Sequence, residues 1–287
     1  MDLSGKTILI TGSTDGVGRH VALALGAAGA KVLVHGRDRQ RGQAVVETLR
    51  KAGNAGAQLY LADLASLAEV RALAEAIRRD HQRLDVLINN AGIGSASGGR
   101  QRRTSADGHE LRFAVNYLSG FLLTRLLLPL MVASAPSRIV NVASAGQSAI
   151  DFDDVMLTRR YDGGRAYTQS KLAQVMFTFD LARELDGSNV TVNCLHPATY
   201  MDTTMVRESG VSPLSSVEEG ADAILQLAVS PDLEGRSGLY FQGRREAKAH
   251  PQAYDDDARR RLAALSFELT GLSRTTGHTG QPTGSER

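Results

Sequence analysis

A tyrosine and a lysine four residues apart, Tyr167 and Lys171, are the first residues of this sequence that could do chemistry together. In a helix this spacing places both side chains on one face, within reach of a common ligand. A free phenol loses its proton near pH ~10, which is too high for proton transfer at neutrality. A neighbouring ammonium favours the phenolate, so the pair predicts a tyrosine that acts as a general acid or base. The same spacing also arises on ordinary surface helices, and its interpretation depends on the motifs around it.

A glycine-rich turn lies near the start of the chain. Gly12, Gly16 and Gly18 follow the short apolar run 6–11 and precede a small-residue helix over 21–30. Glycine permits positive φ and close approach of the main chain to a ligand, and a helix start offers free N–H groups to a pyrophosphate. A tight packing turn is the alternative interpretation. No Gly-Lys-Ser/Thr ending follows, which excludes a nucleoside triphosphate loop.

The next strand, 32–35, ends in Gly36, Arg37 and Asp38. Dinucleotide-binding folds read the adenosine ribose at this point, where an acid bonds the free 2′-hydroxyl and an arginine pairs with a 2′-phosphate. Because Arg37 comes first, the sequence favours NADP(H). Asp38 is near enough to keep NAD(H) possible.

Polar residues follow two further predicted strands. Asp63 and Leu64 follow the strand 58–61, where the acid either bonds an adenine amino group or caps the helix that begins near Ser66; capping is the preferred interpretation. The run 89–92, Asn-Asn-Ala-Gly, follows a strand over 84–88. Its amides could join strand ends and leave a flat floor for a cofactor, or form a plain Asx turn.

Ser144 and Asn116 complete the candidate site. Ser144 follows a buried strand over 138–142 and would face the crevice where open α/β sheets bind ligands. No Gly-x-Ser-x-Gly elbow surrounds it, which argues against a hydrolase nucleophile. Asn116 lies among apolar residues of a long helix predicted to begin near Ala106, and it is either a satisfied polar group or a functional one.

Alternating strands and helices predict a single α/β domain over residues 1–272. Its seven-stranded, mostly parallel sheet would be doubly wound, with helices on both faces. The remaining strands are expected at 189–195 and 238–241, and further helices at 217–229 and 253–269. Residues 273–287 are rich in Ser, Thr, Gly and Pro and are expected to form a disordered tail.

Composition narrows the class of protein. A net charge of +2 without a basic stripe argues against nucleic acid as a partner. Cys194 is the only cysteine, so neither an intrachain disulfide nor a cysteine-based metal site can form, and no metal is expected. The apolar stretch 121–132 is too short to span a bilayer and contains Arg125 and Pro129. The first residues lack a secretory layout, so we expect a cytoplasmic protein.

Taken in order, these motifs resemble the short-chain dehydrogenase/reductase superfamily over residues 6–241. Within it the chain is similar to the branch that contains retinol dehydrogenases and protochlorophyllide reductases, which often uses NADP(H). The runs that carry this closer resemblance are Ala106–Gly108, Val115–Leu118, Phe121–Thr124 and Ser170–Ala173.

The resemblance implies a Rossmann fold and an NAD(P)-dependent oxidoreductase that reduces a ketone or aldehyde, or oxidises a secondary alcohol. Tyr167 would pass the proton, Ser144 would hold the substrate oxygen, Lys171 would bind the nicotinamide ribose, and Asn116 would position a relay water. The implied cofactor contacts are Gly12, Ser13, Asp15, Gly16, Val17, Gly18 and Arg37 towards the phosphates, Asp63 and Leu64 at the adenine, Asn90, Ala91 and Gly92 at a ribose, and Tyr167, Lys171, Pro197 and Thr203 near the nicotinamide.

The chain departs from the family pattern after its sixth strand. Pro197 is followed by Ala198 rather than glycine, and Asp202 stands where a threonine is usual, with Thr203 one place later. A carboxamide contact by Thr203 is therefore an open assignment. The segments 94–105, 146–165 and 199–216 would line the substrate pocket, the last as a lid or as an ordinary connection.

The resemblance and the Leu-rich segment 121–131 also predict a homodimer or homotetramer. Two alternative functions remain: a redox-sensing regulator that binds NADP(H) without catalysis, and a transferase that binds a nucleotide or methyl donor. Neither has a use for the combination of Ser144, Tyr167 and Lys171.

Overall fold

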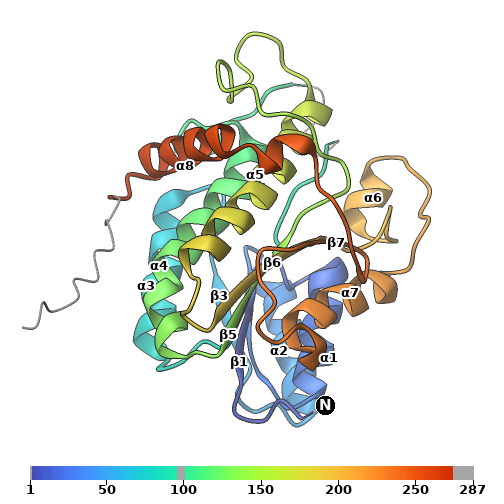
Figure 1. The fold of residues 1–287 in the computed structure, drawn as a ribbon. Coiled ribbons are helices and arrows are strands. Elements are labelled where there is room, and N and C mark those ends of the chain that lie inside the picture. The colour runs from blue at the N-terminus through green and yellow to red at the C-terminus, as the bar shows by residue number, and fades with distance from the viewer. Residues whose placement is uncertain (1, 96–100, 274–287) are drawn as a thin grey trace, which may run out of the picture.

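A single twisted sheet forms the centre of the protein (Figure 1). The computed structural model describes residues 2–95 and 101–273. The strand order is β3-β2-β1-β4-β5-β6-β7-β8, and every neighbouring pair is parallel except β7 and β8. The strands are β1 Thr7–Ile10, β2 Lys31–Gly36, β3 Gln58–Leu61, β4 Val86–Asn89, β5 Ser137–Val142, β6 Val190–His196, β7 Tyr240–Gln242 and β8 Arg245–Glu246.

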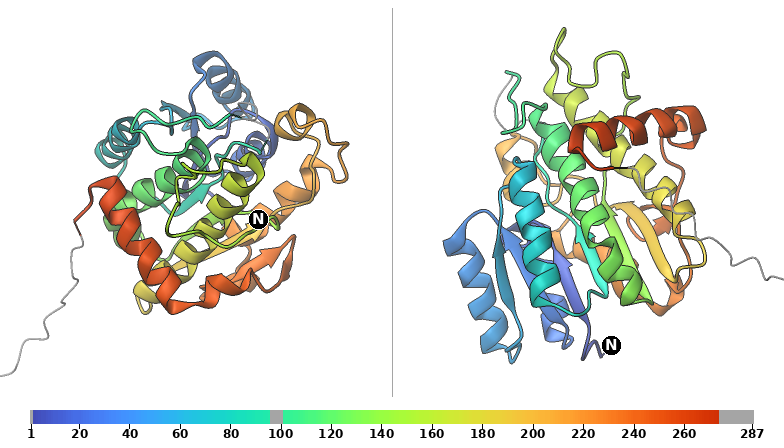
Figure 2. Two further views of the ribbon diagram at one scale, coloured as in Figure 1. Left: turned by 90° about the horizontal axis from the view of Figure 1, so that it is seen from above. Right: turned by 90° about the vertical axis from the view of Figure 1, so that its left-hand side faces the viewer.

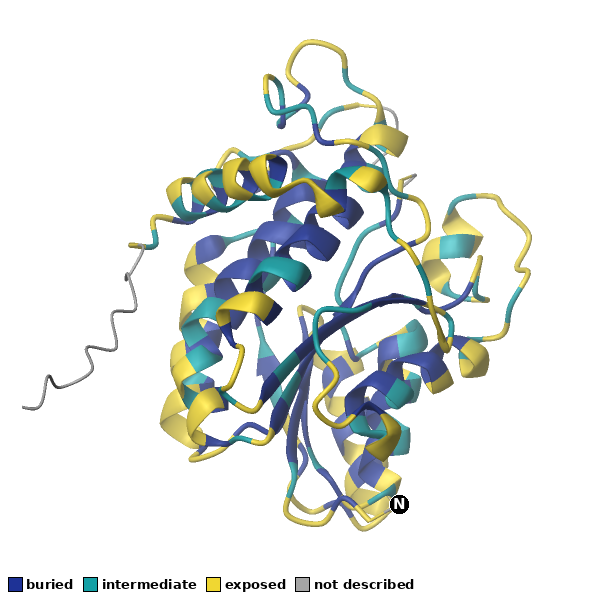
Figure 3. Ribbon diagram, viewed as in Figure 1, coloured by how far each residue is buried: buried dark blue, intermediate teal, exposed yellow. Residues whose placement is uncertain are grey.

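Helices cover both faces of the sheet (Figure 2). Alternate strand residues point to opposite faces, so Leu9 and Leu87 pack with α3, α4 and α5 while Ile8 and Ile88 pack with α1, α2 and α7. The central strands β1, β2, β4, β5 and β6 are accordingly mostly buried, whereas both residues of β8 are exposed (Figure 3). The helices are α1 Gly16–Ala27, α2 Arg39–Lys51, α3 Leu67–Asp80, η1 Phe113–Leu118, α4 Ser119–Ala133, α5 Gly163–Glu184, α6 Thr204–Glu208, α7 Val217–Val229, η2 Pro231–Leu233, η3 Pro251–Tyr254 and α8 Asp256–Thr270.

The strand order reverses between β1 and β4. From β1 the chain winds outward through β2 to β3, and from β4 it winds the other way through β5 to β6. At such a reversal the connections at the carboxyl ends diverge and leave the crevice in which doubly wound sheets bind ligands. The glycine turn after β1 and the Asn-Asn-Ala-Gly run after β4 meet there, as the sequence predicts.

The sheet has eight strands rather than the predicted seven. The chain turns at Gly243, whose φ is +56°, and returns as the two-residue strand β8, which pairs antiparallel with β7. The predicted strand number is therefore one too low, and β8 rather than β7 lies at the edge. So short a strand, with both residues charged, carries no hydrophobic alternation from which it could be recognised.

The helix that holds Asn116 begins later than predicted. Its first helical residue is 111, because the carboxylate of Glu110 caps it by accepting from the Phe113 N–H at 2.7 Å. Asp107, the predicted start, instead accepts a hydrogen bond from the Leu67 N–H at the start of α3. The carboxylate of Asp107, expected at the start of the Asn116 helix, therefore binds the start of α3, and Glu110 caps the Asn116 helix instead.

The η1 and α4 segments form one apolar helix, Phe113–Ala133. Its 21 residues are long and apolar enough to cross a membrane by length and composition alone, and 56% of the qualifying window is buried inside the fold. The sequence argument that the apolar stretch is too short was therefore wrong about its length. Phe121, Leu123 and Leu127 are buried within the chain, so they give no separate support for a subunit interface.

Helix α8 packs across α4 and α5 (Figure 1). The Arg125 guanidinium lies 5.2 to 5.8 Å from the ring centres of Phe121, Phe177 and Phe267, which come from these three helices. Such contacts contribute about 0.5–2 kcal/mol each, depending on burial. The hydroxyls of Tyr117 and Ser266 hydrogen-bond at 2.6 Å in the same interface.

The turn after β1 can be built only with glycine at two positions. A side chain on Gly12, whose φ is +64°, would place Cβ 2.9 Å from Ala91 Cα. On Gly18 it would lie 2.3 Å from Gly12 O and 2.4 Å from Asn90 Nδ2. These close approaches bring β1 and β4 together at the crevice.

We expect Gly18→Ala to destabilise the protein by about 1–3 kcal/mol, because the added methyl forces the two main chains apart. Gly120→Ala is the matched control, since its Cβ would meet Asn89 at an ordinary 3.6 Å. Urea unfolding midpoints measure both. Equal midpoints for the two variants would contradict the close packing described for this turn.

Candidate active site

Four side chains predicted to do chemistry lie together at the carboxyl edge of the sheet. Ser144 follows β5, Tyr167 and Lys171 lie on α5, and Asn116 lies in η1. The Ser144 and Tyr167 hydroxyls hydrogen-bond, and Lys171 Nζ is 5.8 Å from the centre of the Tyr167 ring. A methyl group on Gly92 would lie 3.3 Å from Asn116 Oδ1 and 3.5 Å from Lys171 Nζ.

The electrostatics of Tyr167 differ from the sequence prediction. Desolvation raises the pKa of its phenol, the hydrogen bond with Ser144 lowers it, and the phenol of Tyr200 raises it, with a raised pKa as the result. Lys171 does not lower this pKa, because its amine lies over the ring and is bonded elsewhere. A raised pKa keeps Tyr167 protonated at neutral pH but makes its phenol a weaker proton donor than a free tyrosine.

The amine of Lys171 is buried and held by neutral acceptors. Nζ donates to Val142 O and to Gln174 Oε1, each at 2.9 Å. Desolvation lowers the pKa of Lys171 to about 7. At neutral pH both the charged and the neutral form of this amine are therefore populated, whereas an exposed lysine is almost entirely charged.

Asn116 lies in a six-residue π-helical segment, Phe113–Leu118. Its Oδ1 accepts from the Ile93 N–H at 2.8 Å, and its Nδ2 donates to Ile93 O at 3.2 Å and to Ser170 Oγ at 3.0 Å. The side chain thus joins the segment after β4 to α5. Single π turns inside α-helices frequently mark functional sites.

A small internal cavity lies beside Asn116. Its lining includes Thr11, Asn89, Asn116 and Gln174, and about 10 Å³ of it is open to the centre of a water molecule. That space is close to the minimum for one water. Among the described residues, Asn89 Oδ1 is a buried acceptor without a hydrogen-bond partner, which a water here would satisfy.

The glycine turn uses some of its own N–H groups internally. Gly12 N–H donates to His35 Nδ1 at 3.1 Å, and Ser13 N–H donates to His35 O at 2.9 Å. Burial lowers the pKa of His35 to about 4, so the ring stays neutral and Nδ1 remains an acceptor. Ser13, predicted to offer its main chain to a pyrophosphate, is thus engaged within the protein. The start of α1, with Val17, carries the donors that remain to face a phosphate.

The run after β4 joins the ends of two neighbouring strands. Asn90 Nδ2 donates to Thr11 O at 2.9 Å and to Gly12 O at 3.1 Å. In return, Thr11 Oγ1 accepts from the N–H groups of Asn90 and Ala91, each at 3.0 Å. These side-chain to main-chain bonds hold the ends of β1 and β4 together and confirm the stitching interpretation over a plain Asx turn.

At the end of β2, Arg37 and Asp38 are both exposed. Asp38 Oδ1 caps α2 by accepting from the Arg41 N–H at 3.0 Å, which leaves Arg37 as the residue that follows the strand directly. At the end of β3, Ser66 caps α3, so the preferred interpretation of Asp63 as that cap is wrong. Asp63 Oδ1 instead accepts from the Ala65 N–H at 2.9 Å.

Leu64 and Pro197 are buried, and Leu64 is part of the hydrophobic core at 7% exposure. Its side chain is therefore largely occupied by packing, and only its main chain and edge remain for an adenine contact. Pro197 ends β6 as predicted, beside His196, whose Nε2 lies 3.0 Å from Thr199 Oγ1.

The segment after β6 folds over the glycine turn. Thr203 Cγ2 would lie 3.3 Å from a Cβ placed on Gly16, whose φ is +50°. The neighbouring Thr204 Oγ1 donates to Asp15 Oδ2 at 2.9 Å, while Asp15 Oδ1 caps α1 by accepting from the Gly16 N–H. Thr203 thus lies beside the glycine turn, and its assignment to the carboxamide stays a prediction. The helix α6 that it caps was not predicted.

Sequence reasoning missed several residues of this region. His35 was treated only as a strand residue, and Tyr200 carried no motif, although the structure places it near Tyr167 with a positive φ of 45°. Gln174, which binds Lys171, lies on the same helix face three residues later, a spacing that could have identified it. Among the described residues no group of three or more His, Cys, Asp or Glu could hold a metal ion.

The buried amine predicts a pH-dependent stability. The folded chain loses the Lys171 proton at about pH 7, whereas an unfolded lysine keeps it to about pH ~10.4. Between these values the unfolded state binds more protons, so the free energy of unfolding should rise with pH. Lys171→Met should remove that contribution, whereas exposed Lys51→Met should keep it. Urea midpoints at pH 7 and pH 9 measure the effect, and the same rise in both variants would contradict it.

The comparisons with known proteins agree with this geometry. The family model for short chain dehydrogenase matches residues 6–212. Human retinol dehydrogenase 13 is 40% identical over 94% of this chain and 86% of its own length, and mouse retinol dehydrogenase 14 is 40% identical over 94% and 87%.

Two solved structures are similar over most of the chain. An uncharacterized protein from Mycobacterium paratuberculosis superposes with a TM-score of 0.77 at 28% identity, covering 94% of this chain and 95% of that one. The RhlG/NADP active-site complex of Pseudomonas aeruginosa has a TM-score of 0.68 at 30% identity, covering 84% and 95%. The chain therefore belongs to the short-chain dehydrogenase/reductase family of NAD(P)-dependent oxidoreductases, in its retinol-dehydrogenase-like branch.

Proposed function

We propose that this protein is an NADP(H)-dependent oxidoreductase that interconverts a carbonyl compound and the corresponding alcohol, with Tyr167 as the general acid and base. The observation that carries the proposal is the hydrogen bond between the Ser144 and Tyr167 hydroxyls beside the Lys171 amine. Several relatives are named as retinol dehydrogenases, so retinaldehyde is the first aldehyde to test, followed by chemically distinct ketones and aldehydes.

The crevice fits a dinucleotide. The glycines at 12 and 18 let the main chains pack closely at the turn, and the N–H groups at the start of α1 follow directly after it. Together with Asn90 below, this arrangement supports a pyrophosphate at the α1 terminus and a nicotinamide ribose near Lys171. When bound, the cofactor would supply or accept the hydride.

The protein's own residues would then position the substrate and protonate its oxygen. Ser144 Oγ would hydrogen-bond the substrate oxygen, and Tyr167 would donate its proton to that oxygen during reduction. Lys171, whose pKa lies at about 7, would take part in restoring the proton. A water in the cavity beside Asn116 would continue the path, which supports the relay role expected of Asn116.

Tyr167→Phe should reduce kcat by ~10²–10⁴ because it removes the proton donor and keeps the ring. NADPH binding, followed by its fluorescence, should change little. Tyr60→Phe serves as the control, because that hydroxyl bonds Asp80 on the far edge of the sheet. Full NADPH-dependent turnover by Tyr167→Phe would refute the mechanism. Tight NADPH binding with no turnover across the panel by the unaltered protein would favour the redox-sensing alternative.

The preference for NADP(H) rests on Arg37. Asp38, the group that could bond a free 2′-hydroxyl, is engaged as the α2 cap. Arg37→Ala should raise the KM for NADPH by ~10–100-fold, since a charge-assisted bond to the 2′-phosphate is lost, and leave the KM for NADH nearly unchanged. Arg50→Ala, at the other end of α2, is the control. Parallel increases for both cofactors would contradict the assignment.

Association and location remain proposals from the sequence. A homodimer or homotetramer rests on the family resemblance alone, because the segment 121–131 packs largely within its own chain. A cytoplasmic location is likewise proposed from the sequence alone.

A further inference from the structure

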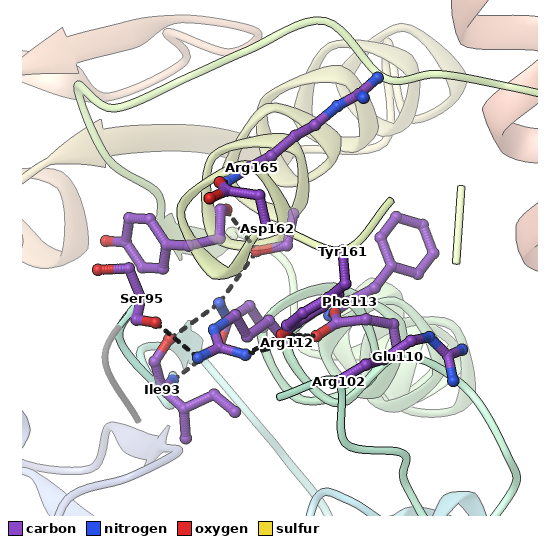
Figure 4. A network of polar contacts seen from close by, with 12 residues as sticks. Ile93, Ser95, Arg102, Glu110, Arg112, Phe113, Tyr161, Asp162 and Arg165 are labelled. Atoms are coloured by element: carbon purple, nitrogen blue, oxygen red, sulfur yellow. Dashed lines mark hydrogen bonds and ion pairs between the residues drawn. The ribbon is translucent and has the colours of Figure 1, made fainter. Parts of the chain in front are cut away.

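A buried ion pair lies beside the site and has no role in the proposed chemistry (Figure 4). Glu110 is 0% exposed and Arg112 1% exposed, with Arg112 Nη1 3.6 Å from Glu110 Oε1. The Tyr161 hydroxyl bridges them, donating to Glu110 Oε1 at 3.1 Å and accepting from Arg112 Nη1. Figure 4 shows the three side chains converging at the start of the helix that carries Asn116.

Such a pair is weak evidence for stability. Removing two charges from water costs several kcal/mol per ion, and apolar residues of similar volume often serve equally well. A buried ion pair is retained more readily where its directional bonds hold neighbouring segments in one arrangement, which is a hypothesis to be argued for each protein. The partners of Arg112 and Glu110 are therefore informative.

These partners are main-chain groups of the segment after β4 and of the helix that carries Asn116. Arg112 Nε donates to Gly94 O at 3.0 Å, and Nη2 donates to Ser95 O at 2.6 Å. Glu110 Oε2 accepts from the Phe113 N–H at 2.7 Å. The guanidinium fork thus fixes the chain just after the Asn-Asn-Ala-Gly run, and the carboxylate fixes the start of the helix that carries Asn116.

The same cluster contacts the start of α5. A Cβ on Gly163 would lie 2.9 Å from Ser95 O and 3.4 Å from Arg112 Nη2, so the backbone here packs directly on the cluster. Tyr161 lies near the end of the segment 146–162. This segment begins beside Ser144, since a Cβ on Gly146 would lie 3.5 Å from the Ser144 hydroxyl. Both chain segments that flank the substrate side of Ser144 and Tyr167 are thereby tied to one guanidinium.

We propose that Arg112, together with Glu110 and Tyr161, is a positioning residue that sets the shape of the substrate pocket and so determines how large a carbonyl substrate is accepted. Arg112 is 1% exposed and packs against residues 94–95 and 161–163, so it offers almost no surface to a substrate or cofactor. It acts through the position of these segments. The proposal rests on the proposed function, because it concerns the substrate of the same site.

Arg112→Lys tests the proposal. It keeps the charge that Glu110 requires but loses the planar fork that reaches two carbonyls and a hydroxyl together. We expect the KM for retinaldehyde, a bulky aldehyde, to rise ~10-fold, which corresponds to the loss of one charged hydrogen bond. The KM for the small aldehyde propanal, the kcat and the Kd of NADPH should each change less than about twofold. Arg138→Lys is the matched control, because Arg138 also donates to two carbonyls, Leu227 O and Ser230 O, away from the site.

Tyr161→Phe is a milder second variant that removes only the bridging hydroxyl. We expect it to raise the KM for retinaldehyde as well, but by less than Arg112→Lys does. An unchanged ratio of the two KM values in folded Arg112→Lys would overturn the proposal. Equal losses for both aldehydes and for NADPH would also overturn it, because they indicate a general structural role.

Amide hydrogen exchange gives a readout that needs no turnover. In Arg112→Lys, exchange in peptides covering 86–95 and 146–162 should be ~10-fold faster than in the unaltered protein, with β1 and β2 peptides unchanged. If the unaltered protein turns over neither these aldehydes nor any other carbonyl of the panel, the proposed function fails, and the exchange rates still decide whether Arg112 holds these segments. Unchanged exchange would overturn the positioning role by itself.

Discussion

The burial of one amine constrains this active site more than any other interaction. Lys171 Nζ is bound by a main-chain carbonyl at the end of β5 and by an amide on its own helix, and neither acceptor carries a charge. An amine can be placed there only if α5 packs closely on β5. That packing fixes Tyr167, one turn earlier on α5, against Ser144, which follows β5. The relative position of the two hydroxyls is therefore a property of a helix–sheet contact.

The same burial sets the proton affinities at the site. Desolvation acts on both groups in opposite directions, since it favours the neutral phenol and the neutral amine. In this arrangement Tyr167 is protonated at neutral pH and is a weaker acid than a free tyrosine, because its pKa is raised. An anionic ligand at the start of α1 would favour the charged form of Lys171 and, through it, proton release from the phenol. The direction of proton transfer can thus depend on what occupies the crevice.

Much of this arrangement follows from sequence patterns, for identifiable reasons. The glycine turn and the run 89–92 could be predicted because close main-chain approach admits few residue types. The Tyr167 and Lys171 pair could be predicted because helical spacing is local. The electrostatic prediction was wrong because it treated proximity along a helix as proximity of charged atoms, whereas the amine is bonded to β5.

Other features depend on contacts between distant segments, which no local pattern encodes. Asp107 caps α3 across 40 residues, and Thr204 bonds Asp15 across 189. The cluster around Arg112 joins residues that are ordinary singly, an acid and an arginine near a predicted helix start and a tyrosine in an irregular segment. The strand β8 is too short and too polar to leave a periodic signal.

Helix α8 has a consequence for the order in which the protein matures on the ribosome. Phe121 and Phe177 are almost fully shielded from water in the finished protein, and Phe267 from α8 contacts the ring of Phe121. Until residues 256–270 leave the exit tunnel, the outer surface of α4 and α5 presents uncovered aromatic rings. The glycine turn after β1 and the run after β4 are therefore synthesised well before α8, which covers the α5 helix that carries Tyr167.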